Sequence, residues 1–111
     1  MRRKFRLTKS ADYKRVRRYG KSFAHPLIVL IALPNNLDHS QIAVSCGHSL
    51  GNAVERNRVK RRIRACLQIL INRIIPGWNI IFIARRPIIY SSFQQLNDAI
   101  IDTLEKAQLL L

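Results

Sequence analysis

The residues best suited to chemistry are the cations between Gly51 and Arg64, where the chain reads GNAVERNRVKRRIR. Six of the nine residues from Arg56 to Arg64 are Lys or Arg, and Glu55 is the only acid nearby. On a helix, such charges repel each other by roughly a few tenths of a kcal/mol for each pair four residues apart. Solubility alone would favour mixed signs. The segment therefore predicts a surface for phosphates, which release counterions when they are bound and which match the forked donors of Arg.

A self-contained catalytic site is not expected. The three histidines have no spacing to Cys or acid that would hold a metal: His25, His39 and His48. Three of the six acids, Asp98, Asp102 and Glu105, share one helix face, and a solvated face is the simpler interpretation. There is no Gly-rich phosphate loop. We expect no catalytic residue, no metal site, no cofactor and no small-molecule ligand on the protein alone.

Length and charge indicate the class of partner. The 111 residues predict one domain, residues 1–111, and 48% hydrophobic composition is enough for a core. The net charge is +14, with ten of the twenty cations in Met1–Lys21, so residues 1–9 are expected to form a basic, flexible arm. Nucleic acid is the usual partner of such a chain. No membrane partner is expected, and Cys46 and Cys66 are expected to be reduced and buried, which favours the cytoplasm.

The periodicity predicts an α+β fold with the order α-β-β-α-β-α. We expect a helix over residues 10–19 that ends at Gly20, and strands over 27–33 and 41–46 that pair as a hairpin. A long helix follows from the N-cap Asn52 to about Ile75, then a strand over 78–84 and a last helix that Ser92 and Gln95 cap.

The long helix is predicted to be amphipathic. With a step of about 100° per residue, its apolar side chains fall in one arc that should face the core: Val59, Ile63, Cys66, Leu67, Leu70 and Ile74. The cations spread over the rest of the helix and should face a partner.

Gly51–Val54, Arg56–Arg58, Lys60, Arg61 and Arg64 together resemble the RNR signature of the bacterial ribonuclease P protein family. Arg6–Leu7 with Asp12–Tyr13 is similar to the opening of that family, and Ile81–Pro87 is similar to its last strand and the turn after it. The resemblance covers nearly the whole chain.

The resemblance implies a left-handed βαβ crossover, similar to a domain of some ribosomal proteins, which is a rare exception to the right-handed rule. It implies an RNA-binding subunit that assists a catalytic RNA in removing the 5′ leader of precursor tRNA. The RNA would carry out hydrolysis with Mg²⁺, and the protein would promote substrate and magnesium binding. The RNR helix would bind the catalytic RNA through Asn52, Arg56, Asn57, Arg58, Lys60, Arg61, Arg62 and Arg64.

A cleft between the first helix and the sheet would hold the leader through Lys9, Tyr13, Lys14, Arg17, Ile31, Ser45 and His48. Two departures stand out. His48 and Ser49 occupy positions where the family commonly has a Lys pair, and Arg17 and Ile31 occupy positions that are often aromatic. Leader binding here should depend more on charge and aliphatic packing.

The main alternative is a structural protein of the ribosome that binds rRNA, which composition and charge alone allow. A DNA-binding protein is less favoured, because the helix order does not give a helix-turn-helix.

Overall fold

The structure, a computed structural model, describes all 111 residues. Its helices are α1 (Ser10–Tyr19), α2 (Ala53–Leu70) and α3 (Phe93–Lys106), and its strands are β1 (Lys21–Ala24), β2 (Ile28–Pro34), β3 (Gln41–Cys46) and β4 (Trp78–Ala84). Short 3-10 helices lie at Arg3–Phe5, His48–Leu50, Ile71–Arg73 and Arg86–Tyr90. The α+β prediction is confirmed, and the predicted bounds of α1, β3 and β4 match the structure.

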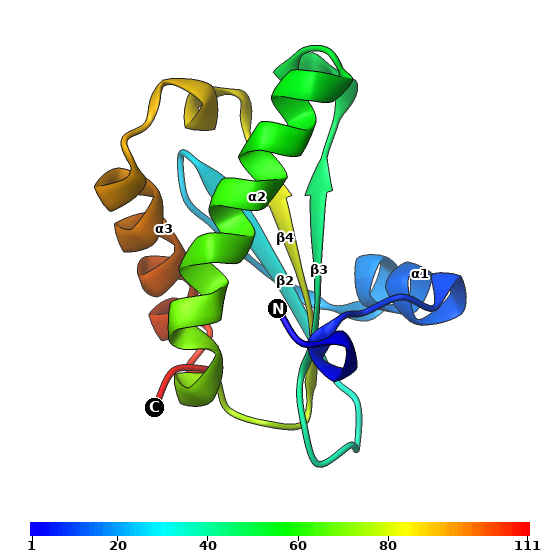
Figure 1. Cartoon of the computed structure of the whole chain (residues 1–111). Helices are drawn as coiled ribbons and strands as arrows, with labels where there is room; N and C mark the ends of the chain where they lie inside the picture. Colours follow the sequence, from blue (N-terminus) through cyan, green and yellow to red (C-terminus); the bar gives the residue numbers. More distant parts are fainter.

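The four strands form one mixed sheet in the order β1-β2-β4-β3. β2 is antiparallel to β1 and β4, whereas β3 is parallel to β4. With β3 and β4 pointing up and α2 in front, the chain passes from β3 through α2 to β4 on its left (Figure 1). The crossover is therefore left-handed, as the family resemblance implied.

The predicted hairpin of β2 and β3 is wrong, because β4 lies between these two strands. β4 is apolar on both faces, with Ile81 and Phe82 fully buried, and a central position lets it pack on both sides. The strand that pairs with β2 as a hairpin is β1, which the sequence did not predict, so the observed order is α-β-β-β-α-β-α. β1 reads KSFA and is mostly exposed at the sheet edge, so it lacks an apolar pattern.

Gly20 connects α1 directly to β1. A Cβ at this position would lie 2.5 Å from the carbonyl oxygen of Val16 and 2.6 Å from Cγ2 of Ile31. Only glycine therefore allows α1 to turn into β1 at this close distance from β2.

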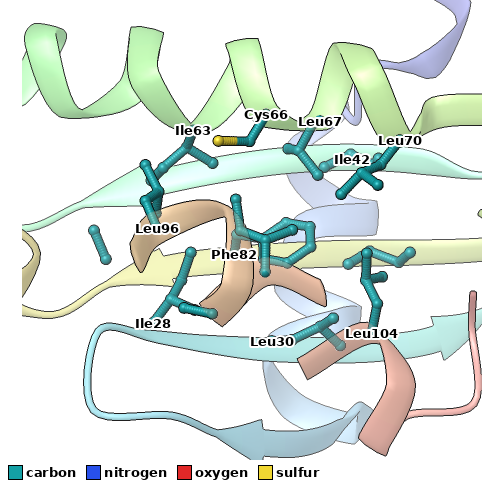
Figure 2. Packing of buried hydrophobic residues seen from close by; sticks show 14 of the residues in the cluster. Ile28, Leu30, Ile42, Ile63, Cys66, Leu67, Leu70, Phe82, Leu96 and Leu104 are labelled. Carbon is teal, nitrogen blue, oxygen red and sulfur yellow. The ribbon is translucent and has the colours of Figure 1, made fainter. Parts of the chain in front are cut away.

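One face of the sheet is closed by α2 and α3. Twenty buried residues form this core, in which Phe82 lies among side chains of both helices (Figure 2). The predicted apolar arc from Val59 to Ile74 is buried throughout. The predicted end of the long helix near Ile75 is wrong, because α2 ends at Leu70 and a 3-10 helix over Ile71–Arg73 precedes Ile74. On α3, the side chains of Leu96, Ile100 and Leu104 are buried. Phe93, the first residue of α3, and Leu111, beyond its end, are 47% and 72% exposed.

Both predicted helix caps are present. Asn52 Oδ1 accepts a hydrogen bond from the Glu55 amide at 2.9 Å, which fixes the start of α2. Gly51 precedes it with φ 120°, a backbone conformation that other residues rarely adopt. Ser92 and Gln95 form a reciprocal capping box at the start of α3.

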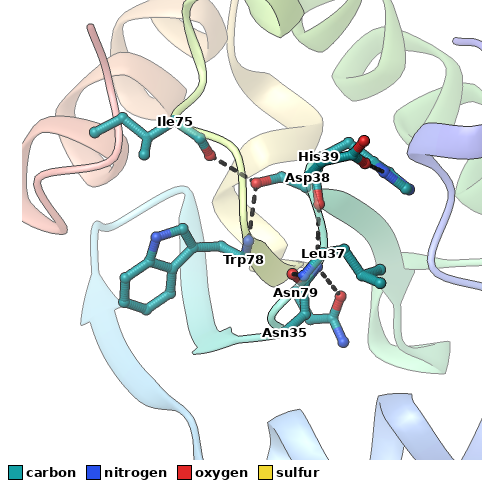
Figure 3. A network of polar contacts seen from close by, with 8 residues as sticks. Asn35, Leu37, Asp38, His39, Ile75, Trp78 and Asn79 are labelled. Carbon is teal, nitrogen blue, oxygen red and sulfur yellow. Dashed lines mark hydrogen bonds and ion pairs between the residues drawn. The ribbon is translucent and has the colours of Figure 1, made fainter.

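A polar network ties the start of β4 to the turn after β2. Asn35 donates to Asn79 Oδ1 at 2.9 Å and to the His39 carbonyl at 3.2 Å. Ser40 accepts from the Trp78 amide at 3.0 Å and donates to the Ile75 carbonyl at 2.6 Å (Figure 3). The buried Asn79 and Ser40 are thereby satisfied, and the backbone of Trp78 is held in place.

Candidate nucleic-acid interface

The cations of α2 form three rows rather than one continuous face. The side chains of Arg61 and Asn57 are exposed and make no hydrogen bond within the chain. A second row runs Arg56, Lys60, Arg64, and a third contains Arg58 and Arg62, each at spacing of four residues. The rows have different neighbours, so they are suited to different tasks.

The row Arg56–Lys60–Arg64 lies against the β3 edge of the sheet. Burial raises the pKa of the Cys46 thiol at the end of β3, and the charges of Lys60, Arg64 and Arg56 oppose that shift. Arg64 also lines a hollow with Arg6 and Leu7 of the N-terminal segment. Arg56 contacts the ring nitrogen Nδ1 of His48, which places His48 with this row. These cations can reach RNA that passes along the β3 edge.

The third row faces the 3-10 helix after β4. Arg62 donates to the carbonyl of Ser91 at 2.6 Å and, at 3.5 Å, to that of Ile88. These bonds fasten α2 to the segment before α3, so part of the donor capacity of Arg62 is used within the protein. Arg58 has no such partner and is exposed beside Phe93.

Asn52, which we expected to contact RNA, uses its side-chain oxygen as the N-cap of α2. Its amide group stays exposed at the first turn of the helix. Its cap fixes the direction in which the cations that follow project.

The opposite face of the sheet carries only α1, which covers it in part. A small cluster of Leu7, Val16, Ile31 and Ile81 is buried under α1, and Tyr13 packs against it. The strand register places the next row across the sheet at Ala24, Val29, Ile83 and Ser45. We call these four residues the open strip, because Ala24 is exposed and the other three are only half-buried.

The two sides of α1 next to its buried residue Val16 face different parts of the sheet. A step of about 100° per residue sets Asp12 and Arg15 on one side of the buried Val16, and Tyr13 and Arg17 on the other. Asp12 and Arg15 line a polar hollow with Asn79 and Gln41. Tyr13 and Arg17 therefore face the open strip.

The structure brings together some of the residues predicted to bind the leader and separates others. Tyr13, Arg17 and Ser45 flank or form the open strip. Lys9 lines the polar hollow on the other flank of α1, and Lys14 points to solvent. Ile31 is only 7% exposed and supports α1 from below. His48 lies beyond the end of β3, near Arg56.

Val29 and Ile83 of the open strip were missed from the sequence. β2 and β4 each read as continuous apolar runs, so neither shows which residues face which helix. The register supplies that signal, since Val29 and Ile83 lie in one row with Ser45.

The N-terminal segment is partly fixed to the sheet. The Leu7 amide donates to the Ile42 carbonyl at 2.9 Å, Arg6 forms an isolated bridge with Ile42, and Leu7 is buried. This contact covers part of the β3 edge, which would otherwise be open to pairing. Residues 6 and 7 are thus not a free arm, whereas the flexibility of the residues before them stays a prediction.

The structure contains no group of three or more His, Cys, Asp or Glu side chains that could hold a metal ion. None of the helices has both the length and the apolar character needed to cross a membrane. The chemistry of the surface is that of Lys and Arg.

Comparisons with known proteins agree with this geometry. Residues 1–108 match the sequence profile of the family Ribonuclease P. The ribonuclease P protein component of Herpetosiphon aurantiacus is 38% identical over 109 residues, which cover 98% of this chain and 89% of that protein. That of Clostridioides difficile is 33% identical over 104 residues, which cover 93% and 91%.

Solved structures show the same fold. The Staphylococcus aureus RNase P protein superposes with a TM-score of 0.87 at 31% identity, covering 96% of this chain and 98% of that one. The Thermotoga maritima protein gives a TM-score of 0.83 at 23% identity, which supports the fold. These matches favour ribonuclease P over a structural protein of the ribosome. By sequence and by fold, this chain belongs to the ribonuclease P protein family.

Proposed function

We propose that the chain is the RNA-binding subunit of a ribonuclease P that removes the 5′ leader from precursor tRNA. The α2 cations bind the catalytic RNA, and the open strip with Tyr13 and Arg17 binds the leader. The relatives are named as ribonuclease P protein components, which supports the pairing with a ribonuclease P RNA. The cytoplasm, where tRNA is processed in bacteria, is the proposed location.

The observation that carries this proposal is that the open strip and one row of α2 cations meet at the same edge of the sheet. The open strip crosses the sheet to Ser45, and the row Arg56–Lys60–Arg64 lies beside the next residue, Cys46. An RNA strand on the strip would therefore reach the row that faces the catalytic RNA. A strip of half-buried aliphatic groups beside Tyr13 suits single-stranded RNA, since stacking and phosphate contacts tolerate any base.

The hydrolysis itself is assigned to the RNA. No cluster of protein side chains could hold a catalytic metal, so the magnesium ions that the holoenzyme requires would be held by the RNA and the substrate phosphate. The protein contributes positive charge around the leader and the RNA, which lowers the repulsion between two polyanions and so promotes substrate and magnesium binding.

Reconstitution tests the proposal. The purified chain should leave precursor tRNA intact, and the chain with its cognate ribonuclease P RNA and Mg²⁺ should release the leader at low salt. Cleavage at the same site by RNA-free protein would overturn the division of labour. Failure of the protein to raise the affinity of the RNA for precursor tRNA would overturn the subunit role.

A further inference from the structure

A cavity of about 480 Å³ lies between the β1–β2 hairpin and the C-terminal end of α3. Its walls include three aromatic rings, of Tyr19, Phe23 and Trp78, and two ammonium groups, of Lys21 and Lys106. Its size is that of a small-ligand site. None of the residues assigned above to the leader or to the catalytic RNA lines this cavity.

The aromatic rings are accessible. Tyr19 is 65% exposed, and Phe23 and Trp78 are half-buried. Cations already lie over two of the rings. Lys21 Nζ is 5.6 Å from the centroid of the Phe23 ring, and the Arg18 guanidinium is 5.3 Å from that of Tyr19. Alternating rings and cations are typical of surfaces that bind unpaired bases.

The charge at the cavity is positive. Lys21 makes no ion pair. Lys106 pairs with Asp102 at 2.8 Å and donates to the Ala24 carbonyl at 3.2 Å, which holds its ammonium group near β1 with a third N–H unused. Asp102 is therefore engaged with Lys106, and Lys21 is free to meet an anion.

Trp78 forms a fixed wall. Its amide donates to Ser40 Oγ at 3.0 Å within the polar network, and its indole extends away from that network (Figure 3). It is the only tryptophan of the chain, so its fluorescence reports on this cavity alone.

We propose that this cavity binds an unpaired nucleotide of RNA, with the base stacked against the rings and the phosphate at Lys21 and Lys106. An apolar ligand would not require two lysines, and a small anion would not require three rings. A nucleotide uses both, and a chain of net charge +14 attracts it electrostatically. This site is a third RNA contact, in addition to the α2 cations and the open strip.

The test is a titration of the full chain with a short oligouridylate, in which the fluorescence of Trp78 is measured at each addition. Binding should quench the fluorescence. Tyr19→Ala should weaken this binding by about fivefold or more, since it removes one stacking partner. Lys21→Gln should weaken this binding too. It should also reduce the slope of the logarithm of the binding constant against the logarithm of the salt concentration by roughly 0.7. Tyr90→Ala, which removes a ring that is 82% exposed and outside the cavity, is the matched control and should change nothing.

Three results would overturn the proposal. The first is absence of quenching at saturating oligouridylate. The second is quenching with equal affinity in wild type, Tyr19→Ala and Lys21→Gln at unchanged melting temperature. The third is displacement of the oligouridylate by tripolyphosphate with equal affinity at matched charge, which would show that the site binds phosphate without contacting a base.

The source of the nucleotide is distinguished in the assembled holoenzyme. Quenching on addition of the catalytic RNA alone would assign the site to that RNA, whereas quenching only with long-leader precursor tRNA would assign it to the substrate. Absence of quenching in both complexes would overturn a role in ribonuclease P. The reconstitution assay above does not depend on this cavity, so the two proposals fail separately.

Discussion

The two faces of the sheet differ in how completely helices cover them. On one face α2 and α3 seal a core of twenty buried residues, whereas on the other α1 buries only four and leaves the open strip beside it. The same strands supply both faces, with Phe82 buried in the closed core and its neighbour Ile83 half-buried in the strip. The closed face stabilises the fold, and the partly covered face is left for a ligand.

The largest expected effect comes from replacing these two neighbours. Phe82→Ala should lower the free energy of unfolding by about 3–5 kcal/mol, because it empties the centre of the closed core. Ile83→Ala should cost clearly less, about 1–2 kcal/mol, because its side chain is already in part exposed. Urea denaturation of both variants measures the difference, and equal losses would show that the two faces are equally packed.

A second pair of variants separates structural from RNA-binding cations on α2. Arg62→Ala should cost about 1–2 kcal/mol of stability, because it removes the hydrogen bonds to the Ser91 and Ile88 carbonyls. Arg61→Ala should stay within about 0.5 kcal/mol of wild type.

For binding to the catalytic RNA, Arg61→Ala should reduce the salt slope by about one. An unchanged slope in both Arg61→Ala and Arg58→Ala would show that these two side chains do not contact the RNA.

A third variant tests whether the closed face can be weakened without effect on RNA. Ser92→Ala should cost about 1 kcal/mol, because it removes half of the capping box of α3. The affinity for the catalytic RNA should be unchanged, since the Ser92 side chain is bonded to the Gln95 amide and to none of the α2 cations. A matching loss of RNA affinity would mean that the start of α3 belongs to the interface.

The smallest effect concerns the two thiols. Burial raises the pKa of both Cys66 and Cys46, and nearby cations oppose the shift at each. The neutral thiols are thus favoured in the fold. Their contribution to stability is complete below the ordinary thiol pKa of about 8.5 and is lost as the pH rises through the higher values of the folded state.

Alkylation with iodoacetamide at pH 8 should therefore be slow at both sites, and faster at the half-buried Cys46 than at the buried Cys66. Lys60→Gln should slow the reaction of Cys46 further. Faster reaction at Cys66 would show that the closed face opens more readily than its packing indicates.

Much of this arrangement could be predicted from local signals. The cap at Asn52, the buried arc from Val59 to Ile74 and the strand over Trp78–Ala84 are set by neighbours in sequence, and each is confirmed. The position of β4 between β2 and β3 is set by contacts between distant segments, and apolar runs do not specify it. β1 was missed because an exposed edge strand of four residues has little apolar pattern.

The same division applies to the candidate site. The cations of α2 were evident as a cluster, but only the fold shows that Arg62 is fastened to Ser91 while Arg61 is free. Tyr13 and Ser45 were named from the family resemblance. Val29 and Ile83 required the register, because the floor of the open strip comes from strands that are far apart in sequence.

The most direct test of the account is the affinity of the Tyr13→Ala holoenzyme for tRNA with a long leader, a short leader and no leader. Loss of a stacking contact on the open strip should weaken binding of the long-leader precursor by roughly 1 kcal/mol or more. Mature tRNA and the catalytic RNA should bind as to wild type. An equal loss for all three tRNAs, together with a large drop in melting temperature, would show that Tyr13 only packs α1 on the sheet and would contradict leader binding at the strip.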